Sequence, residues 1–416
     1  MYSALTSLRQ ASLPWLCGAL LGAVSLYVST PAQALTYKER QKLDLSSYTV
    51  TDTDASYFDV NRRRALLKTT DNPILINQMD QLRNGESCRQ LLAIPTLDEE
   101  IRLPGFYPSP DAWRLASEPM FQFEGMVSDL AGSYMATGDD YYSNCLVKVL
   151  DRWAKSDALF DFHYSSDDRQ AWYATESMLF AAAMAYSIVR PEVDGMEKEK
   201  SRINAWLNRL AHNHSSIPGG LDGSCCNNHF YRRAVYASMI GVLTEDDELF
   251  RFGVSALYSA LHDLTPEGGL PLELERGRRA THYQNYALLY LITNMQIIFR
   301  QGYDTFSLEV NGNDIHPAVD YAMAIIEDPT KLGDYAPHEQ YRGFMEDGQY
   351  FSWADIYLSH HDDAALEKFI RPYRPLENRS AGGYITLYFL DPEAQRLEIA
   401  DDTVEEKAEV ILPDAD

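Results

Sequence analysis

Residues 119–155 read PMFQFEGMVSDLAGSYMATGDDYYSNCLVKVLDRWAK, and this stretch decides the fold class. Its first half carries an apolar face at helical spacing, formed by Phe123, Val127, Leu130 and Tyr134. Gly138 and the two aspartates that follow end this helix, and a second apolar series begins after them. The stretch therefore predicts two successive helices joined by a short turn, which is a helical hairpin.

The same pattern recurs along the rest of the chain. Further helices are predicted over 170–189, 197–212, 228–243, 246–263, 280–300, 316–326 and 350–370. Strands do not alternate with these helices, and segment 384–389 is the one strand candidate. Antiparallel helices of this length stack into a bundle, a solenoid or a closed toroid. A regular solenoid is disfavoured because no strict sequence repeat is present. We predict an all-α toroid of antiparallel helical hairpins.

The composition is that of a globular protein. Of 416 residues, 45% are hydrophobic and 23% are charged, which provides the side chains for a large core. The formal net charge of −25 repels nucleic acid and anionic membranes unless a local basic surface opposes it. We therefore expect no nucleic-acid partner. The sequence does not indicate an oligomeric state.

Residues 1–34 have the features of a secretory signal peptide. The segment begins with one positive charge, continues with an apolar run over 13–28, and ends with a small-x-small cleavage motif at 32–34. The apolar run is short for a membrane span, and no later apolar stretch is long enough to cross a bilayer. We expect a mature chain that begins at Leu35, is periplasmic and has no membrane anchor.

Three regions are predicted in the mature chain. Residues 35–118 form an irregular N-terminal region, in which 61–85 is a helix candidate. Its Pro- and Gly-rich segment 103–110 is a loop, which is either a lid over a cleft or a plain surface connection. Residues 119–390 form the helical toroid, and 391–416 is a solvated acidic tail.

Four cysteines follow the expected leader, and an even number in an exported protein suggests two disulfides. Three connectivities are possible. We expect Cys88 to pair with Cys145, and Cys225 with its neighbour Cys226. A cysteine-based zinc site is the competing interpretation, but no C-x-x-C spacing supports it.

Histidine pairs are weaker metal-site candidates. His212 and His214 form one pair, and His360 and His361 form another, but neither pair has an evident third ligand. We therefore expect no metal and no cofactor.

Two segments place polar groups in an otherwise apolar, helical context. In 225–233, Asn-Asn-His comes where a helix begins, and asparagine is a common helix cap. In 270–286, Arg276 and Tyr283 share one helical face if the helix starts early. The net charge over residues 221–300 is −2, whereas an even distribution of charge would give about −5. The stretch is therefore electropositive relative to the rest of the chain, which supports a site for a polyanion.

Motifs in these two segments resemble those of a known family. Asn228-His229, then Glu-Leu-x-Arg ending at Arg276, then Tyr-x-Asn-Tyr-Ala-Leu beginning at Tyr283, are similar to the mannuronate-specific alginate lyases of polysaccharide lyase family 5. The similarity runs from about residue 119 to about residue 300. It implies an incomplete (α/α) toroid, an anionic polysaccharide substrate, and Asn228, His229, Arg276 and Tyr283 as catalytic residues.

The implied reaction explains these residue types. It removes the C5 proton, which the adjacent carboxylate makes weakly acidic, and expels the C4 oxygen. Arg276, the Asn228 amide and a protonated His229 would neutralise that carboxylate. In mannuronate the proton and the leaving oxygen lie on the same side, so Tyr283 can serve as both base and acid. We expect Arg276 to lower the pKa of Tyr283. His229 as base with Tyr283 as acid is the main rival assignment.

Five further residues are candidates for binding sugar: Trp172, Gln170, Arg169, Arg279 and Tyr107. Helix-core packing is the alternative for Trp172. Tyr107 is the candidate lid residue, in a region that departs from the family pattern.

Other functions remain open. A glycoside hydrolase would use two carboxylates from Asp222, Glu273 and Glu275, but would leave His229 and Tyr283 without a role. Glucuronan is an alternative polymer, since this residue set recognises a uronate without choosing its configuration. A non-catalytic polyuronate-binding protein would need stacking aromatic side chains and a basic groove, but not Tyr283. We predict a periplasmic lyase of the poly(β-D-mannuronate) type that yields unsaturated uronate ends.

Overall fold

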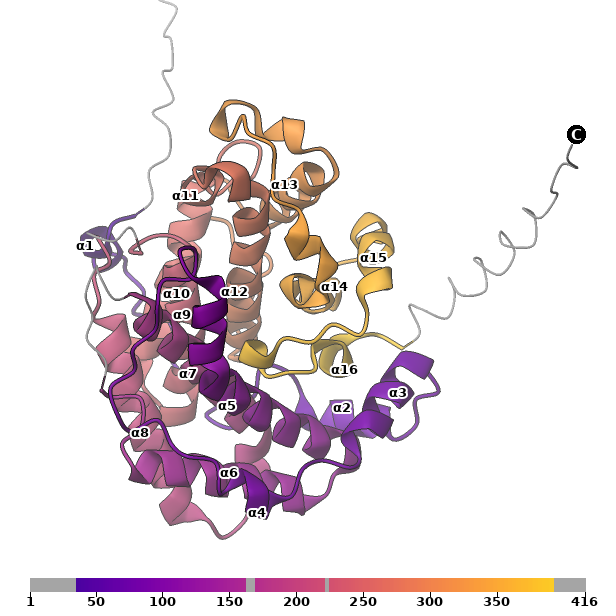
Figure 1. Ribbon diagram of the computed structural model, residues 1–416. Coiled ribbons are helices and arrows are strands. Elements are labelled where there is room, and N and C mark those ends of the chain that lie inside the picture. Colours follow the sequence, from indigo (N-terminus) through magenta and orange to yellow (C-terminus); the bar gives the residue numbers. More distant parts are fainter. Residues whose placement is uncertain (1–34, 162–168, 221–223, 393–416) are drawn as a thin grey trace, which may run out of the picture.

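The computed structural model describes residues 35–161, 169–220 and 224–392 (Figure 1). No β-strand lies in these ranges, where two isolated bridges, at Val310 and at Asn378, are the β pairings present. The all-α prediction is confirmed. The expected leader and nearly all of the acidic tail lie outside the described residues.

Eight long helices form the body of the protein. They are α5 (Pro110–Thr137), α6 (Asp140–Lys155), α7 (Arg169–Val189), α8 (Glu197–Ser215), α9 (Asn228–Thr244), α10 (Asp247–Asp263), α12 (Ala280–Arg300) and α13 (His316–Glu327). From α6 onward these helices begin and end close to the predicted residues. This agreement reflects the long apolar segments and the clear end signals in the sequence.

The first hairpin shows why the chain turns where it does. Gly138 ends α5 with a φ of 70°, a left-handed conformation that glycine adopts without steric cost. Asp139 then caps α6, because its carboxylate accepts a hydrogen bond from the Tyr141 N–H at 2.8 Å. Two adjacent residues thus end one helix and start the next, as predicted.

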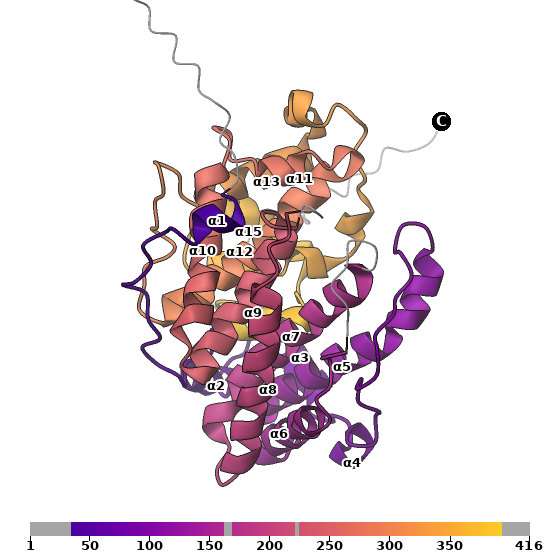
Figure 2. The ribbon, with the colours of Figure 1, turned by 90° about the vertical axis from the view of Figure 1, so that its left-hand side faces the viewer.

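The helices lie in two layers that follow an arc (Figures 1 and 2). α7, α9 and α12 are buried on almost all sides and form the inner layer. α8 buries one stripe and exposes the rest, as an outer helix does. Inner α9 packs on α7, α8, α10 and α12. This arrangement is an α/α toroid, and it places the starts of α9 and α12 beside the same cavity.

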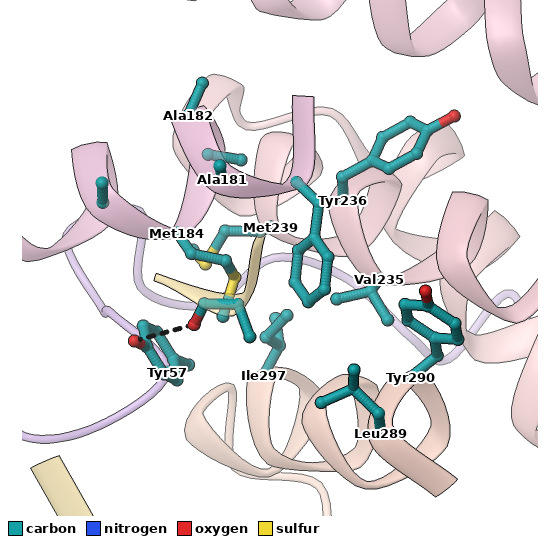
Figure 3. Close-up of a cluster of buried hydrophobic side chains, with 14 of the residues drawn as sticks. Tyr57, Ala181, Ala182, Met184, Val235, Tyr236, Met239, Leu289, Tyr290 and Ile297 are labelled. Carbon is teal, nitrogen blue, oxygen red and sulfur yellow. Dashed lines mark hydrogen bonds between the residues drawn. The ribbon is translucent and has the colours of Figure 1, made fainter. Parts of the chain in front are cut away.

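The core fills the space between the inner helices (Figure 3). Side chains from α7, α9 and α12 meet there, including Ala181, Met184, Val235, Met239, Leu289 and Ile297. The Tyr57 hydroxyl donates to the Ala381 carbonyl oxygen at 3.2 Å. This bond ties the N-terminal region to the C-terminal region across the inner layer.

The N-terminal region is more helical than predicted. It contains α1 (Tyr37–Arg40), α2 (Val60–Leu67), α3 (Pro73–Leu82) and α4 (Cys88–Leu91). The single helix expected over 61–85 is therefore two helices, since Asn72 starts α3 as its N-cap. The predicted loop is confirmed only as far as Ser109, because α5 begins at Pro110, well before residue 119.

Two C-terminal predictions are wrong. The helix expected over 350–370 is broken into a 3₁₀ turn (Gly348–Phe351), α14 (Trp353–Leu358) and α15 (Ala364–Ile370). The strand expected over 384–389 is a helix, α16 (Ile385–Phe389), whose residues are all buried. A short apolar run buried on every side has no periodicity that distinguishes strand from helix.

Both expected disulfides are present. Cys88–Cys145 joins α4 to α6, and Cys225–Cys226 precedes α9. Across the described ranges, no helix combines the length and the apolar character that a bilayer span requires.

Candidate active site

A cleft of about 920 Å³ contains most of the predicted site residues. Its walls come from the loop before α5, from α5 and α7, from the start of α9, from α12 and its preceding turn, and from segments near 341–350 and 378–380. A second cavity of about 790 Å³, between the N-terminal segment, α8 and α10, contains none of those residues. The first cavity is therefore where these residues come together.

The start of α9 places Asn228 and His229 in the cleft. Asn227 is the N-cap, and its side chain accepts a hydrogen bond from the His229 N–H at 3.1 Å. Capping was one interpretation of this asparagine pair, and it applies to Asn227. The next two side chains, from the first turn of α9, line the cleft.

Asn228 is held by Glu273, a residue of α11 (Pro271–Leu274). The Asn228 N–H donates to Glu273 Oε1 at 2.5 Å, and Asn228 Nδ2 lies 3.1 Å from Oε1 and 3.0 Å from Oε2. Burial raises the pKa of Glu273 to about 7, although Arg276 and the Asn228 hydrogen bonds oppose this rise. The two sequence motifs thus meet through a buried carboxyl group.

His229 is neutral, so the expected protonated imidazole is wrong. Burial lowers its pKa well below the usual value, and nearby arginines, Arg232 first, lower it further. Its ring stacks on Tyr173 with centroids 3.8 Å apart. Arg232 Nη2 lies 3.4 Å from His229 Nδ1 and 2.7 Å from a carboxylate oxygen of buried Glu176.

A tight turn brings Arg276 to Tyr283. The helix does not start early, because a 3₁₀ turn (Gly277–Arg279) with a φ of 55° at Gly277 precedes α12. The two residues therefore do not share a helical face as expected. The turn instead places Arg276 Cζ 4.0 Å from the centroid of the Tyr283 ring.

The pKa of Tyr283 is raised, which corrects the expected lowering. Burial is the largest cause, and the hydrogen bond with Tyr107 adds to it, whereas Arg276 acts in the opposite direction. The phenol is therefore the resting form of this side chain.

The loop before α5 reaches Tyr283 directly. The Tyr107 and Tyr283 hydroxyl oxygens lie 2.7 Å apart. Arg279 Cζ lies 4.7 Å from the centroid of the Tyr107 ring and 4.8 Å from that of Tyr341. The loop thus covers part of the cleft, as a lid does, and Arg279 supports it from the opposite wall.

The helix at 169–189 contributes a different aromatic residue from the one expected. Arg169 and Gln170 line the cleft, but Trp172 is fully buried, with Arg233 5.1 Å from its ring centroid. Tyr173 lines the cleft in its place. Trp172 therefore belongs to the core. The sequence around it does not indicate which of the two aromatic residues, Trp172 or Tyr173, faces the core.

Of the three carboxylates named for the hydrolase alternative, the two that the structure describes do not form a pair in the cleft. Glu273 is fully buried against Asn228, Glu275 is exposed, and Asp222 lies outside the described residues. An acid and a base flanking a glycosidic bond require two carboxyl groups facing each other across the substrate.

The histidine pairs have other partners. His212 lies 2.7 Å from Asp246, His214 is 3.0 Å from the Tyr236 hydroxyl, and His360 is 2.6 Å from Gln296 Oε1. His361 packs on His316, with ring centroids 4.2 Å apart. In the part of the chain that the structure describes, no three metal-binding side chains cluster.

Sequence reasoning missed several cleft residues. Arg232, Tyr341, Tyr350, Asn378, Arg379 and Glu124 all line it. Arg379 Nε lies 3.1 Å from the buried Glu124 carboxylate and its Cζ is 4.2 Å from the Phe121 ring centroid. Arg232 lies three residues after His229, so helical spacing could have indicated it. Nothing in the local sequence marks Arg379, which the fold alone brings against α5.

Comparison with known proteins identifies the family. A family model described as alginate lyase matches residues 46–332. A polysaccharide lyase of Stenotrophomonas maltophilia is 27% identical over 65% of this chain and 79% of its own length. An alginate lyase of Pseudomonas syringae pv. syringae is 26% identical over 69% of this chain and 76% of its own length.

Solved structures agree with this match. Alginate lyase A1-III from Sphingomonas species A1 is 30% identical, with a TM-score of 0.76, over 84% of this chain and 99% of that chain. A tyrosine-to-phenylalanine variant of A1-III, complexed with a tetrasaccharide, is 32% identical with a TM-score of 0.77 over the same shares. An alginate lyase from Bacteroides ovatus, 16% identical with a TM-score of 0.58, shares the fold. This chain belongs to the alginate lyase family.

Proposed function

We propose that this protein is a poly(β-D-mannuronate) lyase, which cleaves mannuronate-rich alginate by β-elimination and leaves unsaturated uronate ends. The observation that carries the proposal is the convergence of Asn228, His229, Arg276 and Tyr283 on one cleft. Family membership supports the lyase chemistry. The A1-III structures add support, because tyrosine and histidine variants of that enzyme were complexed with a tetrasaccharide.

Arg276 and Asn228 are proposed to neutralise the substrate carboxylate. The C5 proton becomes acidic only when negative charge on that carboxylate, and on the enolate-like state that follows, is stabilised. A guanidinium with two parallel N–H groups suits a carboxylate. Its position over the Tyr283 ring puts the same positive charge beside the group that moves the proton.

His229 is proposed to act as a hydrogen-bond donor and not as the base. The Arg232 guanidinium can only donate, so the Nδ1 atom that faces it must be the acceptor. The proton of the neutral imidazole is then on Nε2. An imidazole in this tautomer donates one hydrogen bond to substrate and has no free lone pair for the C5 proton.

Tyr283 is proposed to move both protons. Its phenolate takes the C5 proton, and the re-formed phenol gives a proton to the departing C4 oxygen on the same side of the mannuronate ring. The raised pKa makes the phenolate a stronger base for the C5 proton, and it makes loss of the phenol's own proton the demanding step. The positive charge of Arg276 assists that loss, and the Tyr107 hydroxyl lies beside it.

Other arginines of the cleft suit the neighbouring uronates of the polymer. Arg169, Arg279 and Arg379 line the cavity, and Gln170 adds an uncharged amide. We propose that they bind carboxylates and hydroxyl groups on either side of the scissile bond. A protein with the expected leader would meet such a polymer in the periplasm.

The test is the ultraviolet absorbance of the conjugated double bond, followed with polymannuronate, polyguluronate and glucuronan in separate reactions. We expect the absorbance to rise fastest with polymannuronate. A faster rise with glucuronan would move the assignment to that polymer. New reducing ends without absorbance would indicate hydrolysis. If neither signal appears, the non-catalytic binding protein becomes the favoured alternative.

A further inference from the structure

Glu273 is a buried carboxyl group that has no direct part in the elimination. It is fully buried in α11, and both of its oxygens face Asn228. The Asn228 N–H donates to Oε1, while the side-chain Nδ2 lies within 3.1 Å of both oxygens. One residue of the first motif is therefore oriented by one residue of the second.

These contacts decide which half of the Asn228 amide is free for substrate. An ionised carboxylate only accepts hydrogen bonds, so Glu273 holds the NH₂ half. The amide oxygen then points away from Glu273, on a side chain that lines the cleft. A uronate carboxylate also only accepts, and it needs the NH₂ half that Glu273 already holds.

A proton on Glu273 removes this conflict. A protonated carboxyl has one O–H donor, which can bond to the amide oxygen while the other oxygen keeps the Asn228 N–H. The amide can then turn its NH₂ group toward the substrate. Burial places the pKa of Glu273 at about 7, so solvent can supply this proton near neutral pH.

Few charged groups compete with this effect. Arg276 faces Glu273 from the following turn. Tyr231 faces Glu273 from α9. The pKa of Tyr231 is raised mainly by burial, then by Asp263, and then by Glu273. Arg40 of α1 acts on Tyr231 in the opposite direction. Arg276 is thus the one cation among these groups that acts directly on Glu273.

We propose that Glu273 is a positioning residue, which takes up one proton from solvent when a uronate carboxylate binds and so turns the NH₂ group of Asn228 toward the substrate. This inference rests on the proposed lyase function. It predicts that substrate affinity, and not only turnover, depends on the protonation of a group that never touches the sugar.

Calorimetry with a mannuronate tetrasaccharide tests the proposal. A Tyr283→Phe background prevents turnover and removes the Tyr283 titration. At pH 8, in buffers of different ionisation enthalpy, we expect binding to take up close to one proton. Above pH 7 the Kd should rise by up to about tenfold per pH unit. Glu273→Gln in this background should abolish both effects, because glutamine donates to the amide oxygen as protonated Glu273 does.

Glu275→Gln is the matched control, since it removes the same charge two residues away on an exposed side chain, and proton uptake should persist. Two results would overturn the inference. One is binding without proton uptake in the Tyr283→Phe protein, where Glu273 is unchanged. The other is proton uptake that persists after Glu273→Gln. If wild-type protein forms no unsaturated product, the proposed function fails as well. If it does form product while uptake is absent, the inference alone fails.

Discussion

The hydroxyl oxygens of Tyr107 and Tyr283 lie 2.7 Å apart, although 176 residues separate the two tyrosines in the chain. One belongs to the loop that covers the cleft and the other to the first turn of α12. This contact joins the cover of the cleft to the group proposed to move protons. It also raises the pKa of Tyr283, in addition to the larger effect of burial.

Tyr283→Phe should abolish turnover and preserve binding. Removing a proton-transferring group costs about 10²–10⁴-fold in rate, whereas the aromatic ring and the cleft remain. The measurements are kcat from ultraviolet absorbance and Kd from calorimetry. Tyr335→Phe is the control, because Tyr335 is exposed and does not line the cleft. Substantial activity in Tyr283→Phe would remove this residue from the mechanism.

The kcat should rise with pH between about 6 and 9. Burial raises the pKa of Tyr283, so the phenolate is a minor species whose fraction grows by up to about tenfold per pH unit. Saturating polymannuronate separates this effect from changes in affinity. A kcat that falls across this range would instead favour a group that must be protonated.

Arg276→Lys should lower kcat/KM by about 10²-fold, because a lysine cannot offer two parallel N–H groups to a carboxylate. Arg278→Lys is the matched control two residues away. Arg278 is exposed, and its Nε donates to the Glu339 carbonyl oxygen at 3.3 Å. Equal losses in the two variants would show that Arg276 has no specific role.

Glu176→Gln should destabilise the fold. Glu176 is fully buried and its carboxylate lies 2.7 Å from Arg232 Nη2, so the variant leaves a buried guanidinium without its counter-charge. Breaking a buried pair costs about 3–5 kcal/mol in the free energy of unfolding. Urea denaturation measures this cost. Glu197→Gln, at an exposed glutamate that pairs with Lys200, should cost less than about 1 kcal/mol.

His214 should make the fold sensitive to acid. Burial, with smaller effects from Arg233 and Arg232, lowers its folded-state pKa to about 3, below the unfolded value of 6.5. The unfolded chain therefore gains a proton first as the pH falls, and stability is lost between pH 6.5 and pH 3.

Comparison with His214→Gln isolates this effect from other titrating groups. The difference in unfolding free energy between variant and wild type should shift by about 2 kcal/mol in favour of the variant from pH 6.5 to pH 5. His338→Gln, at an exposed position, should show no such shift. A parallel pH dependence of His214→Gln and wild type would contradict the prediction.

The long helices and the family motifs could be read from the sequence. Apolar segments of several turns mark the long helices. Gly138 in the left-handed conformation and Asp139 as the N-cap mark the first turn. The Asn-His, Arg and Tyr motifs likewise depend on local order. These features depend on residues that are neighbours in the chain, so they can be predicted before the fold is known.

Tertiary structure decided the properties that depend on surroundings. Arg276 reaches Tyr283 through a turn and not along a helix face, and Trp172 is buried while Tyr173 lines the cleft. The pKa values of Tyr283 and His229 follow from burial, which no local pattern reveals. Arg379 and Tyr107 enter the cleft from opposite ends of the chain. Desolvation and long-range contact are properties of the packed molecule, because they depend on what covers a side chain and not on what precedes it.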